Sequence, residues 1–169
     1  MSREPRTVDC VILRVGSRIT IHGSLLDVTQ IDFYTHVPDK LRVACALSAK
    51  ARAQGLRLFV CCPDRETAQR FDRMLWTTPA IGFTPHCSSR DPLAPVTPVI
   101  VDHEGEAPPH DEVLLNLGLE CPPYFSRFQR LIEIVSLNDE DRERARSRFR
   151  YYRDRGYEIR THDLSNLDA

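Results

Sequence analysis

The sequence predicts a single-domain α/β fold in which a mostly parallel sheet is flanked by helices. Two observations support this prediction. Apolar strand-like runs alternate with amphipathic helical segments from residue 31 to residue 75, which is the pattern of strand-helix-strand crossover units. The 169 residues are 41% hydrophobic, which is enough to bury one core, and the composition gives no reason for a second domain.

We expect the domain to cover residues 28–164 and residues 165–169 to form a loose tail. Residues 1–27 form an amino-terminal extension without clear periodicity, although residues 8–15 are strand-like. One explanation is that Val28 is the true first residue, read from an alternative start codon. The upstream residues would then be an artefact of gene prediction.

The first half of the domain reads as strand, helix, strand, helix. Residues 31–37 (IDFYTHV) predict a strand, which Pro38-Asp39 ends, and a helix follows as far as Gly55. The apolar run at residues 56–62 is typical of a strand buried on both faces of a parallel sheet, and Pro63-Asp64 opens the second helix. The apolar sides of the two helices are formed by Leu41, Ala44, Cys45, Leu47 and Ala51, and by Ala68, Phe71 and Leu75.

The second half begins at residues 76–86, which contain too many prolines for a core helix. Residues 87–97 are expected to form a surface loop. Further along, we predict strands at 98–103, 113–118 and 131–136, a short helix near Phe125 and Phe128, and an edge strand within 157–164.

The last helix has the clearest boundaries. Asn138 is a favourable N-cap, residues 139–141 place carboxylates at the amino end, and Gly156 ends the helix. At about 100° per residue, a face that we expect to pack is formed by Ala145, Phe149 and Tyr152. Another face, about a quarter of the circumference wide, carries Arg142, Arg146, Arg150 and Arg153.

This arginine face is the predicted working surface. Glu143 and Asp154 are too few to pair with all of its arginines, and guanidinium groups bind carboxylates through two parallel hydrogen bonds. Phe149 borders the face, so the surface suits an acidic peptide that also carries an apolar group. The alternative is a solvated charged helix without a ligand.

Charge and cysteine content exclude several classes of protein. The formal net charge is −1, and the basic character is local to the carboxyl-terminal part, which favours a peptide partner over salt-driven DNA binding. The six cysteines include no CxxC pair, so we expect reduced thiols rather than a zinc ribbon or a disulfide scaffold. No run approaches the ~18 to 20 apolar residues of a membrane span, and Arg14 and Arg18 interrupt the first apolar stretch. We therefore expect a cytoplasmic protein.

No cofactor is expected. The loop after the first predicted strand, THVPDK, matches neither GxGxxG nor GxxxxGK[ST]. The seven glycines are not spaced to cradle a phosphate. A dinucleotide or nucleoside-triphosphate enzyme is therefore not predicted.

An enzymatic alternative uses Cys61 and Cys62, which end a predicted strand just before a helix. A helix amino terminus can lower the pKa of a thiol, and His36 or His86 would serve as the base. We favour the interpretation that both cysteines are buried small hydrophobes, because no acid, amide or oxyanion partner is indicated.

Two further alternatives concern metals and nucleic acid. The spacing of His86, Cys87 and His103 matches no recognised metal site. Direct binding of single-stranded DNA would use Arg146, Arg150, Tyr151 and Arg155 as cationic and stacking groups. It would depend more steeply on salt than peptide binding does.

Several segments in a fixed order resemble a known family. They are IDFYTHV at 31–37, LWTTPAIGFTPH at 75–86, PVIVDH at 98–103, VLLNLG at 113–118 and ARSRFRYYRDRGYEI at 145–159. From about Val28 to Leu164 the chain is similar to the chi subunit of the bacterial DNA polymerase III holoenzyme, an accessory protein of the clamp loader. The resemblance implies a three-layer, Rossmann-like α/β fold without a nucleotide site and without catalytic activity of its own.

The resemblance also implies partners and site residues. Members of the family link the clamp loader, through the psi subunit, to the acidic, phenylalanine-ended tail of the single-stranded-DNA-binding protein. By position, the tail site would consist of Val135, Arg146, Phe149, Arg150 and Arg153. The segment that meets psi, or a repair helicase that competes for the same surface, corresponds to Trp76, Pro79 and Phe83. The alternative is that both aromatic rings belong to the core.

Two features depart from the family pattern. Residues 1–27 have no counterpart in it. Arg150 stands where a lysine is often found, so a point charge is replaced by a planar fork. We expect this replacement to alter affinity while the role is kept.

Overall fold

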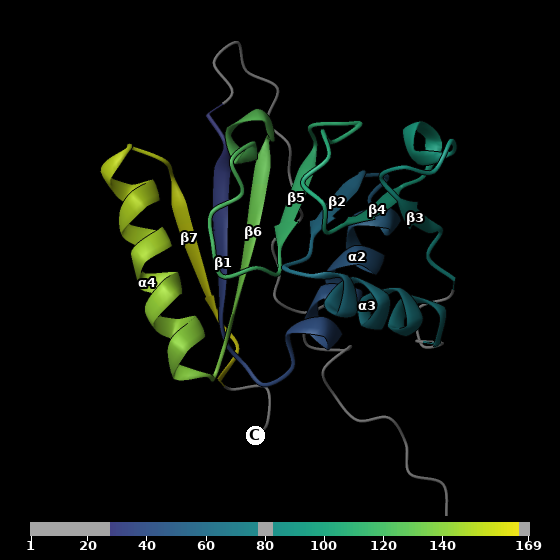
Figure 1. The fold of residues 1–169 in the computed structure, drawn as a ribbon. Coiled ribbons are helices and arrows are strands. Elements are labelled where there is room, and N and C mark those ends of the chain that lie inside the picture. Colours follow the sequence, from purple (N-terminus) through teal and green to yellow (C-terminus); the bar gives the residue numbers. More distant parts are fainter. Residues whose placement is uncertain (1–27, 78–82, 166–169) are drawn as a thin grey trace, which may run out of the picture.

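The computed structural model describes residues 28–77 and 83–165, which form one seven-stranded sheet with helices on both faces (Figure 1). The strand order is β3-β4-β2-β5-β6-β1-β7, and every neighbouring pair in this part of the chain is parallel. The predicted three-layer α/β class is therefore confirmed.

The elements follow the predicted order along the chain, with β3 and η2 as additions that were not predicted. The strands are β1 (Gln30–Val37), β2 (Leu58–Cys61), β3 (His86–Ser88), β4 (Val99–Asp102), β5 (Val113–Asn116), β6 (Arg130–Ser136) and β7 (Ile159–Asp163). The helices are α2 (Lys40–Ala53), α3 (Arg65–Thr77) and α4 (Asp139–Asp154), with short 3-10 segments η2 (Ala94–Val96) and η3 (Phe125–Arg127). In the described residues, no helix combines the length and the apolar composition that crossing a membrane requires.

Neighbouring residues of each central strand contribute to two cores, one on each face of the sheet. Val60 and Ile132 pack beneath α2 and α3, whereas Phe59 and Leu131 pack beneath α4 and the two 3-10 segments. This is the two-residue alternation of a strand that is buried on both faces. It explains why these strands read as continuous apolar runs in the sequence.

At the start of each described helix, a side-chain oxygen accepts hydrogen bonds from backbone N–H groups of the first turn, which have no partner within the helix. Asp39 accepts two such bonds at the start of α2, Asp64 accepts one at the start of α3, and Asn138 accepts two at the start of α4. These starts follow the carboxyl ends of β1, β2 and β6, which is where folds of this class hold phosphate groups. Here the N–H groups are already bonded within the chain.

The predicted helix ends are confirmed as well. Gly55 and Gly156 follow α2 and α4 with φ values of +72° and +82°. A left-handed conformation favours glycine, because other residues meet a steric cost there. Each glycine therefore ends its helix within a short loop that leads to the next strand.

The prediction for residues 87–97 was wrong, because this segment contains most of β3 and all of η2. A strand of three residues is too short to show periodicity. Trp76 also belongs to the end of α3 rather than to an irregular segment. The predictions for residues 1–27, Pro79 and residues 166–169 lie outside the described residues.

A buried carboxylate joins α4 to the sheet. Glu133 on β6 is fully buried and accepts hydrogen bonds from Arg148 Nε at 3.0 Å and from the Tyr152 hydroxyl at 2.8 Å. The Asn116 amide on β5 donates to the same carboxylate at 3.2 Å. Burial raises the pKa of Glu133 against the opposing effect of Arg148, so the charged form depends on these partners.

We predict that Arg148→Ala lowers the free energy of unfolding by about 3 to 5 kcal/mol, because it leaves a buried carboxylate without its cation. Urea unfolding at pH 7 measures the loss. Arg144→Ala is the matched control, since Arg144 lies on the same helix with an exposed side chain bonded to Glu120 at 3.1 Å. Its loss should stay below about 1 kcal/mol. Equal losses in the two variants would contradict the role assigned to Glu133.

Candidate functional site

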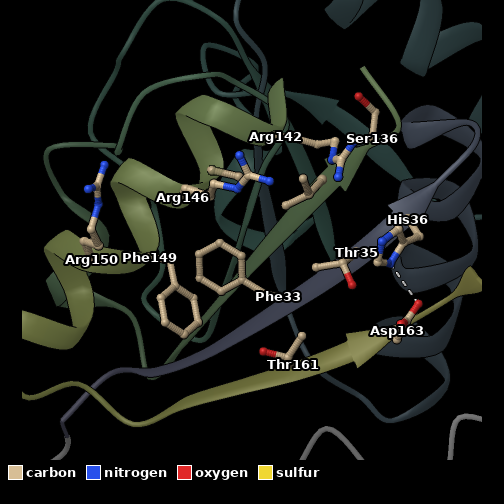
Figure 2. A pocket seen from close by; sticks show the side chains of 12 residues that line it. Phe33, Thr35, His36, Ser136, Arg142, Arg146, Phe149, Arg150, Thr161 and Asp163 are labelled. Carbon is tan, nitrogen blue, oxygen red and sulfur yellow. Dashed lines mark hydrogen bonds and ion pairs between the residues drawn. The ribbon is translucent and has the colours of Figure 1, made fainter. Parts of the chain in front are cut away.

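A cavity of about 640 Å³ lies between α4 and the strands β6, β1 and β7 (Figure 2). This volume is within the usual range of ligand-binding pockets. It lies towards the β7 edge of the sheet, where β7 pairs only with β1 among the described strands. The site is therefore formed by one helix face and the outer part of the sheet.

The floor of the cavity is apolar. Phe33 on β1 and Phe149 on α4 meet edge to face, with ring centroids 5.3 Å apart and an angle of 63° between the rings. Val135 and Ala145 line the cavity beside them and are buried. Phe149 is only half-buried, so its ring remains open to an apolar group of a ligand.

One wall of the cavity is made of arginines from successive turns of α4 (Figure 2). Arg142 lies 3.3 Å from the carboxylate of Asp139. Arg146 and Arg150 are exposed, and within residues 28–77 and 83–165 neither has an ion-pair or hydrogen-bond partner. Two guanidinium groups are thus available to carboxylates beside an apolar floor.

Asp141 fixes the start of α4 beside the cavity. Its buried carboxylate accepts a hydrogen bond from the Ser136 backbone N–H at 2.8 Å and lies 3.1 Å from Lys40 Nζ on α2. Burial raises the pKa of Asp141, but the Ser136 bond and the Lys40 charge outweigh burial and hold this pKa below its ordinary value. The residue that follows is Arg142, so this anchor sets where the arginine wall begins.

The structure brings together four of the five residues predicted for the tail site. Val135, Arg146, Phe149 and Arg150 line the same cavity. Arg153 is not part of the lining, and its guanidinium lies 3.1 Å from the Asp154 carboxylate. The helical spacing grouped these arginines correctly, but Arg153 lies beyond the end of the cavity.

Apart from Val135 on β6, the part of the lining that comes from strands was not predicted from the sequence. Phe33, Thr35 and His36 on β1 and Thr161 and Asp163 on β7 line the cavity opposite the arginines. Both segments were predicted as strands, but no signal in one sequence shows that they lie side by side. The arginine wall alone carried a sequence signal.

Arg148 was also missed as a structural residue. It is 4% exposed, although it lies in the arginine-rich part of the chain. Its position four residues before Tyr152 places it on the packing face of the helix. This spacing was the signal that could have identified it.

The enzymatic and metal alternatives find little support in the geometry. Burial raises the pKa of both the Cys61 and Cys62 thiols, which is opposite to the lowering that a nucleophile requires. His36 lies 2.9 Å from the Asp163 carboxylate, and His86 lies 3.1 Å from the Asp72 carboxylate. Among the described residues, no three His, Cys, Asp or Glu side chains are placed to hold a metal ion.

A second candidate surface lies at the carboxyl end of α3. Trp76 is 62% exposed and Phe83 is 52% exposed, so the alternative that both rings belong to the core is wrong. Their ring centroids are 5.0 Å apart, and the Trp76 and His86 rings also meet edge to face, with centroids 5.2 Å apart. His86 is the first residue of β3, so this aromatic pair lies towards the opposite edge of the sheet from the cavity.

Fold and cavity together define a parallel α/β domain with an arginine-lined cavity between α4 and the strands β6, β1 and β7 at one side of its sheet. A family model described as DNA polymerase III chi subunit, HolC, matches residues 28–160. The chain belongs to this family, which confirms the resemblance seen in the sequence.

Individual relatives agree with this assignment. The chain is 34% identical over 146 residues to DNA polymerase III subunit chi of Pseudomonas aeruginosa, which covers 83% of this chain and 100% of that protein. It is 25% identical over 121 residues to the subunit chi of Escherichia coli strain K12, covering 71% and 82% of the two chains. It is 26% identical over 123 residues to the subunit chi of Haemophilus influenzae, covering 72% and 85%.

We predict that Asp141→Asn destabilises the fold in a pH-dependent way. The folded pKa of Asp141 lies below the unfolded value of about 3.9, so its contribution is full above about pH 4 and is lost as the pH falls through the folded pKa. At pH 7 the variant should lose about 1 to 3 kcal/mol of unfolding free energy, and the difference should narrow towards pH 3. Urea unfolding at the two pH values measures this.

The matched control is Asp139→Asn, in the same helical turn but with a fully exposed side chain. It should change the free energy of unfolding by less than about 1 kcal/mol. A loss in Asp141→Asn that is the same at pH 7 and pH 3 would show that its charge is not the cause.

Proposed function

We propose that the protein is a non-catalytic replication adaptor that links the clamp loader, through the psi subunit, to the acidic tail of the single-stranded-DNA-binding protein. Membership of the chi family supports this proposal. One observation carries the tail part of it. The cavity sets the Phe33 and Phe149 rings beside Arg146 and Arg150, which have no partners in the described chain.

These features match the two kinds of group that an acidic, phenylalanine-ended tail offers. Its carboxylates would bind the guanidinium groups, each charge-assisted hydrogen bond contributing about 1.5 to 3 kcal/mol. Burial of its aromatic ring would contribute about another 1.5 to 3 kcal/mol. After the cost of ordering a flexible tail is subtracted, micromolar affinity, about −8 kcal/mol, is expected.

A specific contact argues against direct stacking of nucleic-acid bases on this helix. The Arg155 guanidinium lies over the Tyr151 ring, 3.5 Å from its centroid. The cation and the aromatic face that a base would need are therefore engaged with each other. The formal net charge of −1 gives no general attraction to a polyanion.

The test of the tail site is a titration with an acetylated peptide copy of the single-stranded-DNA-binding-protein tail of the same organism. We predict micromolar binding that Arg150→Ala weakens about tenfold or more, because a charge-assisted bond is lost. Added salt should weaken binding without abolishing it, since the contribution of the ring is not screened. Calorimetry at low and moderate salt measures all three quantities.

Arg144→Ala is again the control, because Arg144 lies on α4 outside the cavity lining. It should bind the peptide like the wild type. A labelled single-stranded oligonucleotide provides the opposing test. Firm, salt-steep binding of the oligonucleotide together with no binding of the peptide would refute the adaptor and establish direct nucleic-acid binding.

For the clamp-loader side, we propose that Trp76, Pro79 and Phe83 form the surface that meets psi, or a repair helicase that competes for it. The supporting observation is the exposure of two contacting aromatic rings at one edge of the domain. Exposed aromatic side chains of this kind are typical of the centres of protein interfaces. Pro79 enters the proposal through the family resemblance alone.

We predict that Phe83→Ala folds normally and binds psi at least about tenfold more weakly, since exposed aromatic anchors dominate interface energies. Leu93→Ala is the control. Leu93 is also an exposed apolar residue, at 62%, but it lies just before η2 and is not part of the proposed psi surface. Thermal unfolding and a pull-down with purified psi measure the two effects. Unchanged psi binding in a folded Phe83→Ala protein would remove Phe83 from the interface.

A further inference from the structure

His36 lies at an irregular point of β1 on the rim of the cavity. The register between β1 and β6 shifts between Tyr34 and Val37. The φ of His36 is +58°, a left-handed value that only glycines share in the described part of the chain. Successive residues of a regular strand point to opposite faces, yet Thr35 and His36 both line the cavity. The bulge therefore turns His36 towards the cavity at some cost in backbone strain.

The imidazole meets the carboxylate that lies in the lining. His36 Nδ1 is 2.9 Å from Asp163 Oδ1 on β7 (Figure 2). The Ser165 backbone N–H also donates to Asp163 at 2.8 Å, and this bond and the contact with His36 lower the pKa of Asp163. Asp163 is therefore ionised at neutral pH. A carboxylate here faces the arginine wall and repels an acidic ligand.

We propose that His36 and Asp163 form a second, pH-dependent subsite for a carboxylate of the acidic peptide, separate from the one bound by Arg146 and Arg150. This inference rests on the proposed function. With a neutral imidazole the pair carries one negative charge, and with a protonated imidazole it carries none. Protonation cancels the net negative charge of the pair, and it adds an N–H at His36 Nε2 that can donate to a peptide carboxylate while Nδ1 stays bonded to Asp163. Affinity therefore rises as the pH falls.

The other charged groups of the cavity do not change their charge between pH 6 and pH 8. The other charged groups of the lining are Arg142, Arg146 and Arg150 on α4, and arginine side chains stay protonated at every pH used here. The β6 residues of the lining, Val135 and Ser136, carry no charge. Histidines change charge between about pH 5 and pH 8, whereas aspartates of the peptide stay ionised in this range. A second histidine, His162 on β7, lies 2.6 Å from Asp32 and stacks on Tyr34, outside the cavity lining. A pH response is therefore assigned to His36 when His36→Gln abolishes it.

The experiment is calorimetric titration of the acetylated tail peptide at pH 6 and pH 8 and constant ionic strength. The wild type should bind about two- to fivefold more tightly at pH 6, the range of an exposed charge pair. His36→Gln keeps a polar side chain that does not titrate, and it should bind equally at both pH values. Asp163→Asn removes the repelling charge, and it should bind about two- to fivefold more tightly than the wild type at pH 8.

The control is His103→Gln, because His103 lines a separate groove beside α3. It should keep the pH response of the wild type. Equal wild-type affinities at pH 6 and pH 8 would overturn the proposal, as would a response that persists in His36→Gln. If thermal unfolding shows that His36→Gln does not fold, Asp163→Asn decides, and unchanged affinity at pH 8 overturns the subsite.

These outcomes are distinct from a failure of the proposed function. No peptide binding at either pH would refute the tail site as a whole. Binding that depends on Arg150 but not on pH would leave the tail site in place and reduce His36 and Asp163 to a tie between the ends of β1 and β7.

Discussion

The buried charge of Glu133 is the constraint on which the geometry of the cavity depends. Its carboxylate binds Arg148 and Tyr152, which lie four residues apart on α4, and so fixes the rotation of the helix about its axis. With these two residues turned to the sheet, Phe149 falls at the border and Arg146 and Arg150 face the cavity. Residues that touch no ligand therefore decide which arginines are presented.

On the opposite face of the sheet, a second buried carboxylate fixes the strands that form the other wall of the cavity. Asp32 on β1 is fully buried, 2.7 Å from Arg130 Nε on β6 and 2.6 Å from His162 Nε2 on β7. His162 also stacks on Tyr34, with ring centroids 4.6 Å apart. The edge strand is thus attached by buried polar groups as well as by its backbone bonds to β1. Both walls are set from outside the cavity, which leaves its lining free to carry unpaired charge.

The sequence was informative where two signals agreed. For α4, the Asn138 cap and the Gly156 stop enclosed a helical period, and the boundaries were confirmed. The three-residue β3 gave no period, and the pairing of β7 with β1 depends on the whole sheet, so neither could be read from local pattern. The helix half of the cavity was therefore predictable, whereas of the strand half only Val135 was predicted, through the family resemblance. Arg148 shows a second limit of the sequence. A charged residue is expected to be exposed, but Arg148 is buried because it pairs with a buried carboxylate.

The width of the sheet also sets the distance between the two candidate surfaces. Neighbouring strands lie about 4.8 Å apart, and the cavity strands β6, β1 and β7 lie four to six positions from β3, so the sheet separates the aromatic pair from the cavity by about 20 to 30 Å. This is more than twice the distance over which exposed charges interact at physiological salt, about 8 Å. Partners bound at the two edges would neither overlap sterically nor interact electrostatically, and their binding free energies would add. If both proposed surfaces bind partners, the domain would act as a spacer of fixed length, and the avidity of the assembly would depend on the flexible tethers of those partners.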